Sequence, residues 1–231
     1  MGQSKRKLTK KELIRKKRFE ELRSEREQNG YREQSLTVSV LMANLVALVI
    51  MLPFMALIGW LYFAVNKHTG AFASEWGALL LLVYLCLIVV HELIHGITWG
   101  IFAPDHFRSI EFGVIWKALT PYCTCSKPLK KWQYILGTAM PTIVLGFGIA
   151  AVAIVFHSLF LLCLSEIMLW SGGGDFLIIL KILMYCTKSK DIVYCDHPYE
   201  PGVVLFEKNH RCFNWNVFGI LVQSKFSKRR M

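Results

Sequence analysis

The chain has 231 residues, of which 54% are hydrophobic, and its mean hydropathy is +0.41. This composition is typical of an integral membrane protein and argues against an ordinary soluble domain. The formal net charge of +11 is divided among segments separated by apolar runs. A nucleic-acid-binding protein would gather this charge on one soluble module, so we expect no nucleic-acid partner.

Residues 1–34 form a basic N-terminal segment in which lysines and arginines alternate with glutamates. This pattern predicts a solvated cytoplasmic helix, which could also rest on anionic lipid. The segment is too long for the n-region of a signal peptide, and the apolar run that follows is too long for an h-region. We therefore expect the first apolar helix to be retained.

Four segments are apolar over roughly 20 or more residues, enough to cross a bilayer core of about 30 Å. They are Ser35–Ala64, Trp76–Phe102, Tyr134–Phe156 and Leu159–Thr187. Aromatic residues fall near the span ends, as they do at membrane interfaces. The fold class that we predict is an all-α membrane protein whose transmembrane domain of four helices covers residues 35–187.

The positions of the basic residues predict the orientation. Residues 1–33, 103–133 and 188–231 carry 12, 5 and 8 lysines and arginines, which together make 25 of the 27 in the chain. The loop between the first two spans carries only Lys67. The positive-inside rule then places both termini in the cytoplasm, with residues 188–231 as a basic cytoplasmic tail. We expect the protein to lie in the cell membrane, with the lipid bilayer as a partner.

The second span contains an H-E-x-x-H run at His91-Glu92-Leu93-Ile94-His95. Residues i and i+4 project from the same helix face, so His91 and His95 can bind one metal ion. Glu92 occupies the position of the general base in zinc peptidases. Gly96, which follows, would allow another backbone to approach closely. The alternative is an inert bundle in which these polar groups only join helices, but ionisable groups are costly in hydrocarbon and usually functional there.

A catalytic zinc ion usually has three protein ligands, so a third ligand is needed at the same depth. Three acids come into question: Glu111, Glu166 and Asp175. At 1.5 Å per residue, His91 lies about 22 Å from the outer end of its span and Asp175 about 24 Å from that of the fourth span. Glu166 would be only about 10 Å deep, and Glu111 would require its loop to fold back. The depths favour Asp175.

Asp175 directly follows Gly172-Gly173-Gly174. Three glycines remove every side chain that would separate the fourth helix from its neighbour, so the carboxylate could reach a metal ion on the second helix. The alternative is a glycine kink in which Asp175 pairs with Lys181 or with water.

The segment Ile110–Cys125 alternates loosely between apolar and polar residues. It predicts either a short β-hairpin on the cytoplasmic side, whose strand edge could hold an extended substrate, or an irregular loop. Cys123 and Cys125 have one intervening residue, fewer than a zinc knuckle requires, and we expect all seven cysteines to be reduced thiols.

These motifs resemble those of the "putative zincin peptidase" family of small bacterial membrane proteins, which is itself distantly similar to the site-2 proteases. The resemblance covers roughly residues 36–207. Its motifs are His91 to Gly96, Pro121 to Pro128 running into Lys131 to Tyr134, Pro141, Gly172 to Asp175, Asp196 to Pro198, and Pro201-Gly202. The resemblance implies a zinc-dependent metalloprotease. Gly172 to Asp175 replace the Asn-Pro-Asp-Gly type motif of better-known site-2 proteases, and we interpret Asp196 to Pro198 as a turn.

The function that we predict is hydrolysis of peptide bonds within a peptide or membrane-protein substrate. Zn²⁺ would be held by His91, His95 and Asp175, with Glu92 as the catalytic base and the site open to the cytoplasm. Two alternatives stay open. One is a non-catalytic membrane scaffold or accessory protein, and the other is a zinc hydrolase that does not cleave proteins.

Overall fold

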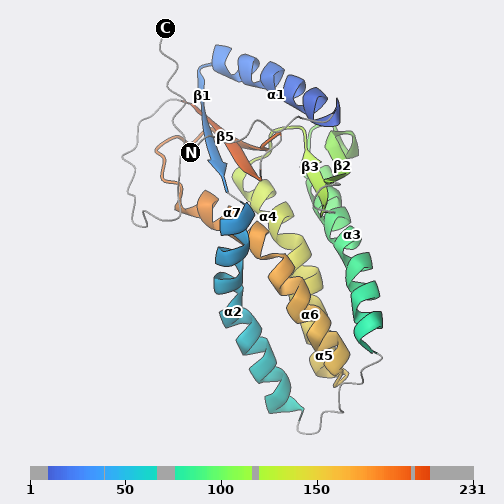
Figure 1. Cartoon of the computed structure of the whole chain (residues 1–231). Coiled ribbons are helices and arrows are strands. Elements are labelled where there is room, and N and C mark those ends of the chain that lie inside the picture. Colours follow the sequence, from blue (N-terminus) through green and yellow to red (C-terminus); the bar gives the residue numbers. More distant parts are fainter. Residues whose placement is uncertain (1–9, 39, 67–75, 116–119, 199–200, 209–231) are drawn as a thin grey trace.

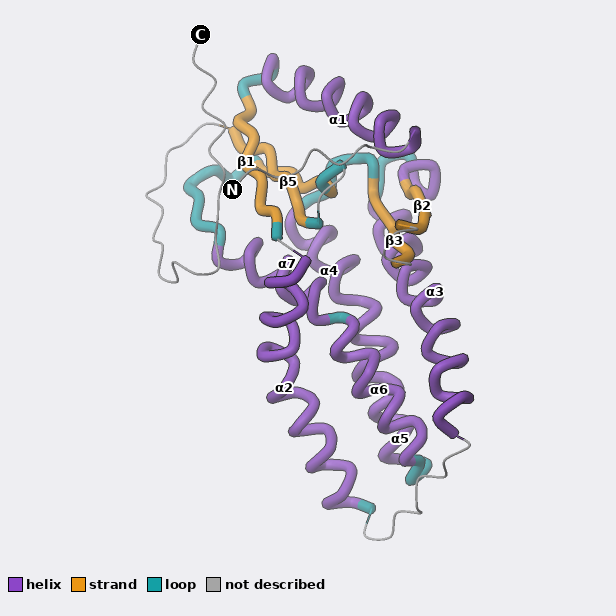
Figure 2. The backbone as a smooth tube through the Cα atoms, in the orientation of Figure 1, coloured by secondary structure: helices purple, strands orange, loops and turns teal. Residues whose placement is uncertain are grey.

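The computed structural model describes residues 10–38, 40–66, 76–115, 120–198 and 201–208. Apolar helices form one end of the molecule, and short strands gather at the other end under an N-terminal helix (Figure 1, Figure 2). The predicted loop around Lys67, the thiol of Cys212 and the remainder of the basic tail lie outside the described residues.

Most of the described chain is helical. The α-helices are α1 (Lys10–Gln28), α2 (Val40–Val65), α3 (Trp76–Phe102), α4 (Lys131–Pro141), α5 (Ile149–Val155), α6 (Leu159–Ser171) and α7 (Gly173–Met184). A π-helical segment, Thr142–Gly148, joins α4 to α5, so that these elements form one continuous rod. A short 3₁₀-helix, His106–Ser109, follows α3.

Among the described residues, three helical segments are long and apolar enough to cross a membrane: Leu45–Val65, Trp76–Phe102 and Lys131–Val155. The pair α6 and α7 makes a fourth if it is counted as one span, with a bend of 43° between its halves. Large apolar side chains on these helices face outward, such as Leu82, which is 60% exposed. Helices that meet lipid expose such side chains.

The hairpin predicted over Ile110–Cys125 is confirmed. Strand β2 (Ile110–Ile115) pairs antiparallel with β3 (Thr120–Cys125), and Phe112 lies opposite Cys123. The alternative of an irregular loop is therefore wrong. The hairpin lies beside the C-terminal part of α3 (Figure 1).

A second, three-stranded sheet corrects the prediction of an all-α fold. Strands β1 (Tyr31–Thr37), β5 (Gly202–Lys208) and β4 (Ile192–Asp196) pair antiparallel in the order β1-β5-β4. The first apolar helix accordingly begins after β1, at Val40, and not at Ser35. Asp196 is the last residue of β4 and does not belong to a turn, because it is paired with Val203.

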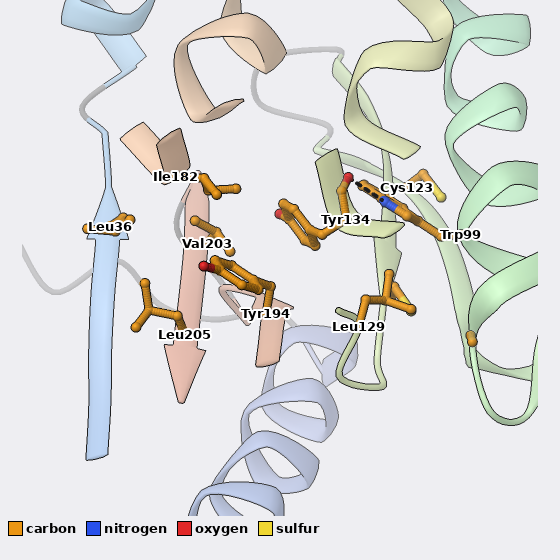
Figure 3. Close-up of a cluster of buried hydrophobic side chains, with 11 residues drawn as sticks. Leu36, Trp99, Cys123, Leu129, Tyr134, Ile182, Tyr194, Val203 and Leu205 are labelled. Carbon is orange, nitrogen blue, oxygen red and sulfur yellow. Dashed lines mark hydrogen bonds between the residues drawn. The ribbon is translucent and has the colours of Figure 1, made fainter. Parts of the chain in front are cut away.

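The main hydrophobic core lies where the strands meet the helices. Tyr134 of α4 packs between Trp99 of α3, at a centroid distance of 5.6 Å, and Tyr194 of β4, at 6.2 Å. Val203 and Leu205 of β5 are fully buried in the same cluster (Figure 3). Burial of aromatic rings at this junction fixes the strands against the helices.

Helix α1 covers the outer side of the strands (Figure 1). Phe19 and Leu22 pack against a cluster that includes Phe206 of β5. The Arg15 guanidinium lies 4.6 Å from the centre of the Tyr122 ring. The N-terminal segment is thus helical over Lys10–Gln28, as predicted, and one face of this helix packs against protein.

Candidate metal centre

Helix α3 places His91 and His95 on its buried face. Their side chains are 9% and 5% exposed, and their Nε2 atoms are 3.2 Å apart. The run around them is apolar and β-branched only in part, so it continues as a regular helix in which i and i+4 residues are neighbours. Two imidazole nitrogens therefore face one point between α3 and its neighbours.

Asp175 of α7 reaches the same point. Its Oδ2 atom lies 3.1 Å from Nε2 of His91 and 3.4 Å from Nε2 of His95. Two ligand atoms that share a tetrahedral zinc ion at bond lengths of 2.0–2.1 Å are about 3.3 Å apart. The spacing and chemical nature of these three donors therefore fit Zn²⁺, whose tetrahedral coordination takes one further ligand. Among the described residues, these three form the one group of His, Cys, Asp and Glu ligand atoms close enough to hold a metal ion.

The glycines before Asp175 act at helix contacts that differ from the expected one. A Cβ atom on Gly172 would lie 2.1 Å from Oγ1 of Thr142, and a Cβ atom on Gly173 would lie 2.6 Å from that of Ala47. The fourth span therefore approaches α2 and the rod of α4 through its glycines, and not α3. An added Cβ on Gly174 would meet no atom within 4 Å.

Asp175 lies in the first turn of α7, just after the bend at Gly172. A carboxylate is favourable there because the unsatisfied backbone N–H groups give a helix N-terminus a partial positive charge. The alternative partner, Lys181, lies elsewhere, since its Nζ atom donates to the carbonyl of Thr37 at 2.8 Å. Asp175 therefore contacts the two histidines and does not pair with Lys181.

His95 is held by contacts on its other side. Its Nδ1 atom lies 2.8 Å from the carbonyl oxygen of Gly137, and its ring stacks on Trp99 at 5.0 Å. A carbonyl can only accept, so Nδ1 carries the proton, and Nε2 is the nitrogen that is available to a metal ion in the neutral ring. This is the tautomer that a metal ligand requires. Nδ1 of His91 is also buried but has no hydrogen-bond partner among the described residues.

Glu92 lies between the metal centre and the hairpin. Its half-buried carboxylate is electrostatically coupled to His95, His91 and Asp175, and it accepts from the backbone N–H of Cys123 in β3. Glu92 does not belong to the group of ligand atoms. This position is suited to a group that takes a proton near the centre without binding the ion.

The hairpin closes over α3 next to His95. A Cβ atom on Gly96 would lie 2.4 Å from Cζ of Phe112 and 3.1 Å from Cγ2 of Ile110. Gly96 therefore allows a close approach, as expected, but the group that approaches is a ring and not a backbone.

The two hairpin thiols belong to the core. Burial raises the pKa of Cys123 above its usual value and that of Cys125 to about 12, so both stay protonated at neutral pH. A protonated thiol is a poor metal ligand. The six described cysteines are free thiols.

The other two candidate acids lie away from the ligand group. Glu111 of β2 pairs with Arg18 of α1. Glu166 lies within α6, and one of its carboxylate oxygens is buried without a hydrogen-bond partner among the described residues. Neither shares the point between the histidines and Asp175.

Asp196 has a role that the sequence did not reveal. Its carboxylate accepts from the Tyr134 hydroxyl at 2.6 Å and from the Cys125 backbone N–H at 2.7 Å. Burial raises the pKa of Asp196, and these two hydrogen bonds oppose the rise. Asp196 thereby joins the hairpin, β4 and the helix that carries Gly137. A carboxylate directly after the Ile-Val-Tyr-Cys run of a strand is the local signal that could have indicated it.

A protein family matches part of the chain. Residues 84–190 match the sequence model of a family described as putative zincin peptidase. This stretch contains both histidines, Glu92 and Asp175. No curated protein and no solved structure matches the chain.

Proposed function

Because residues 84–190 match the sequence model of a family described as putative zincin peptidase, we propose that the protein is a membrane-embedded zinc metallopeptidase. The observation that carries this proposal is the convergence of His91, His95 and Asp175, whose ligand atoms are 3.1 to 3.4 Å apart. The two histidines come from α3, and Asp175 comes from α7, 84 positions after His91 in the chain. A buried group of two imidazoles and one carboxylate matches the donor set of catalytic zinc sites.

His91, His95 and Asp175 would hold the ion, which when bound supplies a nucleophilic water at neutral pH. Glu92 would accept the proton of that water on its carboxylate and pass it to the nitrogen of the leaving amine. The buried position of both histidines would limit access of other water to the reacting atoms. The bond cleaved is the C–N bond of a peptide, which yields a carboxylate and an amine.

The proposed substrate is a peptide or a membrane protein that enters in an extended form beside the hairpin. Extended segments pair with strand edges through backbone hydrogen bonds, and β3 lies next to Glu92 through its Cys123 N–H. The hairpin would lie on the cytoplasmic side of the cell membrane, because the basic residues of the chain flank that end of the helices.

The test is a search for new protein N-termini. Membranes from cells that produce the wild type would be compared with membranes from cells that produce Glu92→Gln, by N-terminal labelling and mass spectrometry. We expect a set of termini that depends on Glu92, since loss of a general base lowers such rates by about 10²–10⁴-fold. Identical termini in both samples would contradict a peptidase and favour a hydrolase of other substrates.

A further inference from the structure

Pro141 interrupts the backbone hydrogen bonds of α4. In an α-helix, the carbonyl of residue i accepts from the N–H of residue i+4, so the regular donor to Gly137 would be residue 141. Proline has no N–H. The next N–H along the chain, that of Thr142, donates to the carbonyl of Ala139. The Gly137 carbonyl therefore lacks its regular α-helical donor.

The freed carbonyl accepts from a side chain of the neighbouring helix. Nδ1 of His95 lies 2.8 Å from the Gly137 oxygen, in a region where both residues are buried. The approach of the two helices depends on Gly137, because a Cβ atom there would lie 2.1 Å from Cδ1 and Nε1 of Trp99. Pro141 thus supplies an acceptor, and Gly137 supplies the space that lets His95 reach it.

We propose that Pro141 is a positioning residue for the metal centre, because it keeps the Gly137 carbonyl available to orient His95. The inference rests on the proposed zinc site. Histidine ligands are usually held by an acceptor at their second nitrogen, which fixes the tautomer and the ring orientation. Here a backbone carbonyl fills that role, and a residue four positions further along the helix determines whether the carbonyl is free.

If Pro141 only stabilised the fold, its replacement by alanine would lower the stability of the protein. The expected change is the opposite. Proline inside a helix removes a hydrogen bond and destabilises the helix. The distortion is visible here, because the rod continues directly after Pro141 as the π-helical segment Thr142–Gly148. Replacement by alanine should restore the missing hydrogen bond. The helix would gain stability while His95 loses its acceptor.

The experiment compares Pro141→Ala with the wild type in detergent, using the full chain. Zinc affinity is measured by competition with a chromophoric chelator, and thermal unfolding is followed in the metal-free protein. We expect Pro141→Ala to bind zinc about 10–100-fold more weakly, the range found when outer partners of metal ligands are removed. Its unfolding midpoint without metal should equal or exceed that of the wild type.

The chain offers a matched control in Pro53, which lies inside α2 and does not belong to the group of ligand residues. Pro53→Ala should leave zinc affinity unchanged. A second variant carries lactic acid at position 141 and so has the alanine side chain on an ester that lacks the N–H. This variant should bind zinc like the wild type.

Three results would overturn the inference. One is wild-type zinc affinity in Pro141→Ala, and another is equal loss in the lactic acid variant, which would implicate the proline ring and not the missing N–H. The third is a lower unfolding midpoint that accompanies the loss of affinity. Failure of the zinc site itself would look different, since His95→Ala would then match the wild type in zinc content.

Discussion

Asp175 contacts both histidines through a single carboxylate oxygen, Oδ2, at 3.1 and 3.4 Å. A neutral amide oxygen is a poorer zinc ligand than a carboxylate, so Asp175→Asn should weaken zinc binding by more than about tenfold, and Asp175→Ala by more. Chelator competition measures both effects.

Glu166→Gln is the control for this prediction. Glu166 is also a carboxylate within an apolar helix, but it lies outside the group of ligand atoms. Its replacement should leave zinc affinity unchanged. If Glu166→Gln weakens binding while Asp175→Asn does not, the third ligand is wrongly assigned.

At the scale of residues, the sequence predicted the three converging side chains but not the groups that hold them. The histidine pair follows from helical spacing, and Asp175 follows from depth along an apolar span. Asp196 and the Gly137 carbonyl could not be found in this way. Their partners lie 71 and 42 positions away along the chain, and only the packed fold brings them together.

At the scale of elements, the junction of α6 and α7 offers a comparison between neighbouring glycines. Alanine at 173 would force its Cβ to within 2.6 Å of the Ala47 Cβ atom, whereas alanine at 174 meets nothing within 4 Å. We expect Gly173→Ala to lower the free energy of unfolding by about 1–3 kcal/mol, the usual cost of overpacking. Gly174→Ala should be neutral or slightly stabilising, because alanine favours a helix over glycine.

Zinc occupancy should fall in Gly173→Ala and stay unchanged in Gly174→Ala. A displacement of α7 at position 173 would also displace Asp175, which is only two residues further along the helix. Thermal unfolding in detergent and metal analysis of the two variants measure these effects. Equal behaviour of Gly173→Ala and Gly174→Ala would contradict the packing of α7 against α2.

The hairpin can be predicted from the sequence, whereas the three-stranded sheet cannot. The strands β2 and β3 are neighbours in the chain, so a local alternating pattern predicts their pairing. The pairing of β1 with β5 joins residues 31–37 to residues 202–208. Residues 31–37 adjoin a long apolar run, and residues 188–231 were assigned to a tail on the basis of charge. Neither pattern reveals a partner so far along the chain.

At the scale of the whole molecule, the strands and α1 lie at one end of the apolar helices (Figure 2). We propose that this end faces the cytoplasm, because 25 of the 27 lysines and arginines belong to the sequence segments 1–33, 103–133 and 188–231. Reporter fusions after Arg32, within residues 63–75, after Lys127 and at the C-terminus should read in, out, in and in. An external C-terminus would mean that α6 and α7 do not together cross the membrane, and the depth assigned to Asp175 would then fail.

The proposed activity requires that the chain binds zinc between α3 and α7. Metal analysis of the detergent-purified protein should find close to one zinc ion per chain in the wild type and in Glu92→Gln, since Glu92 is not a ligand. The double variant His91→Ala and His95→Ala should hold almost none, because a single carboxylate binds the ion weakly. Full zinc retention in the double variant, or its absence from the wild type, would contradict the metal centre as described.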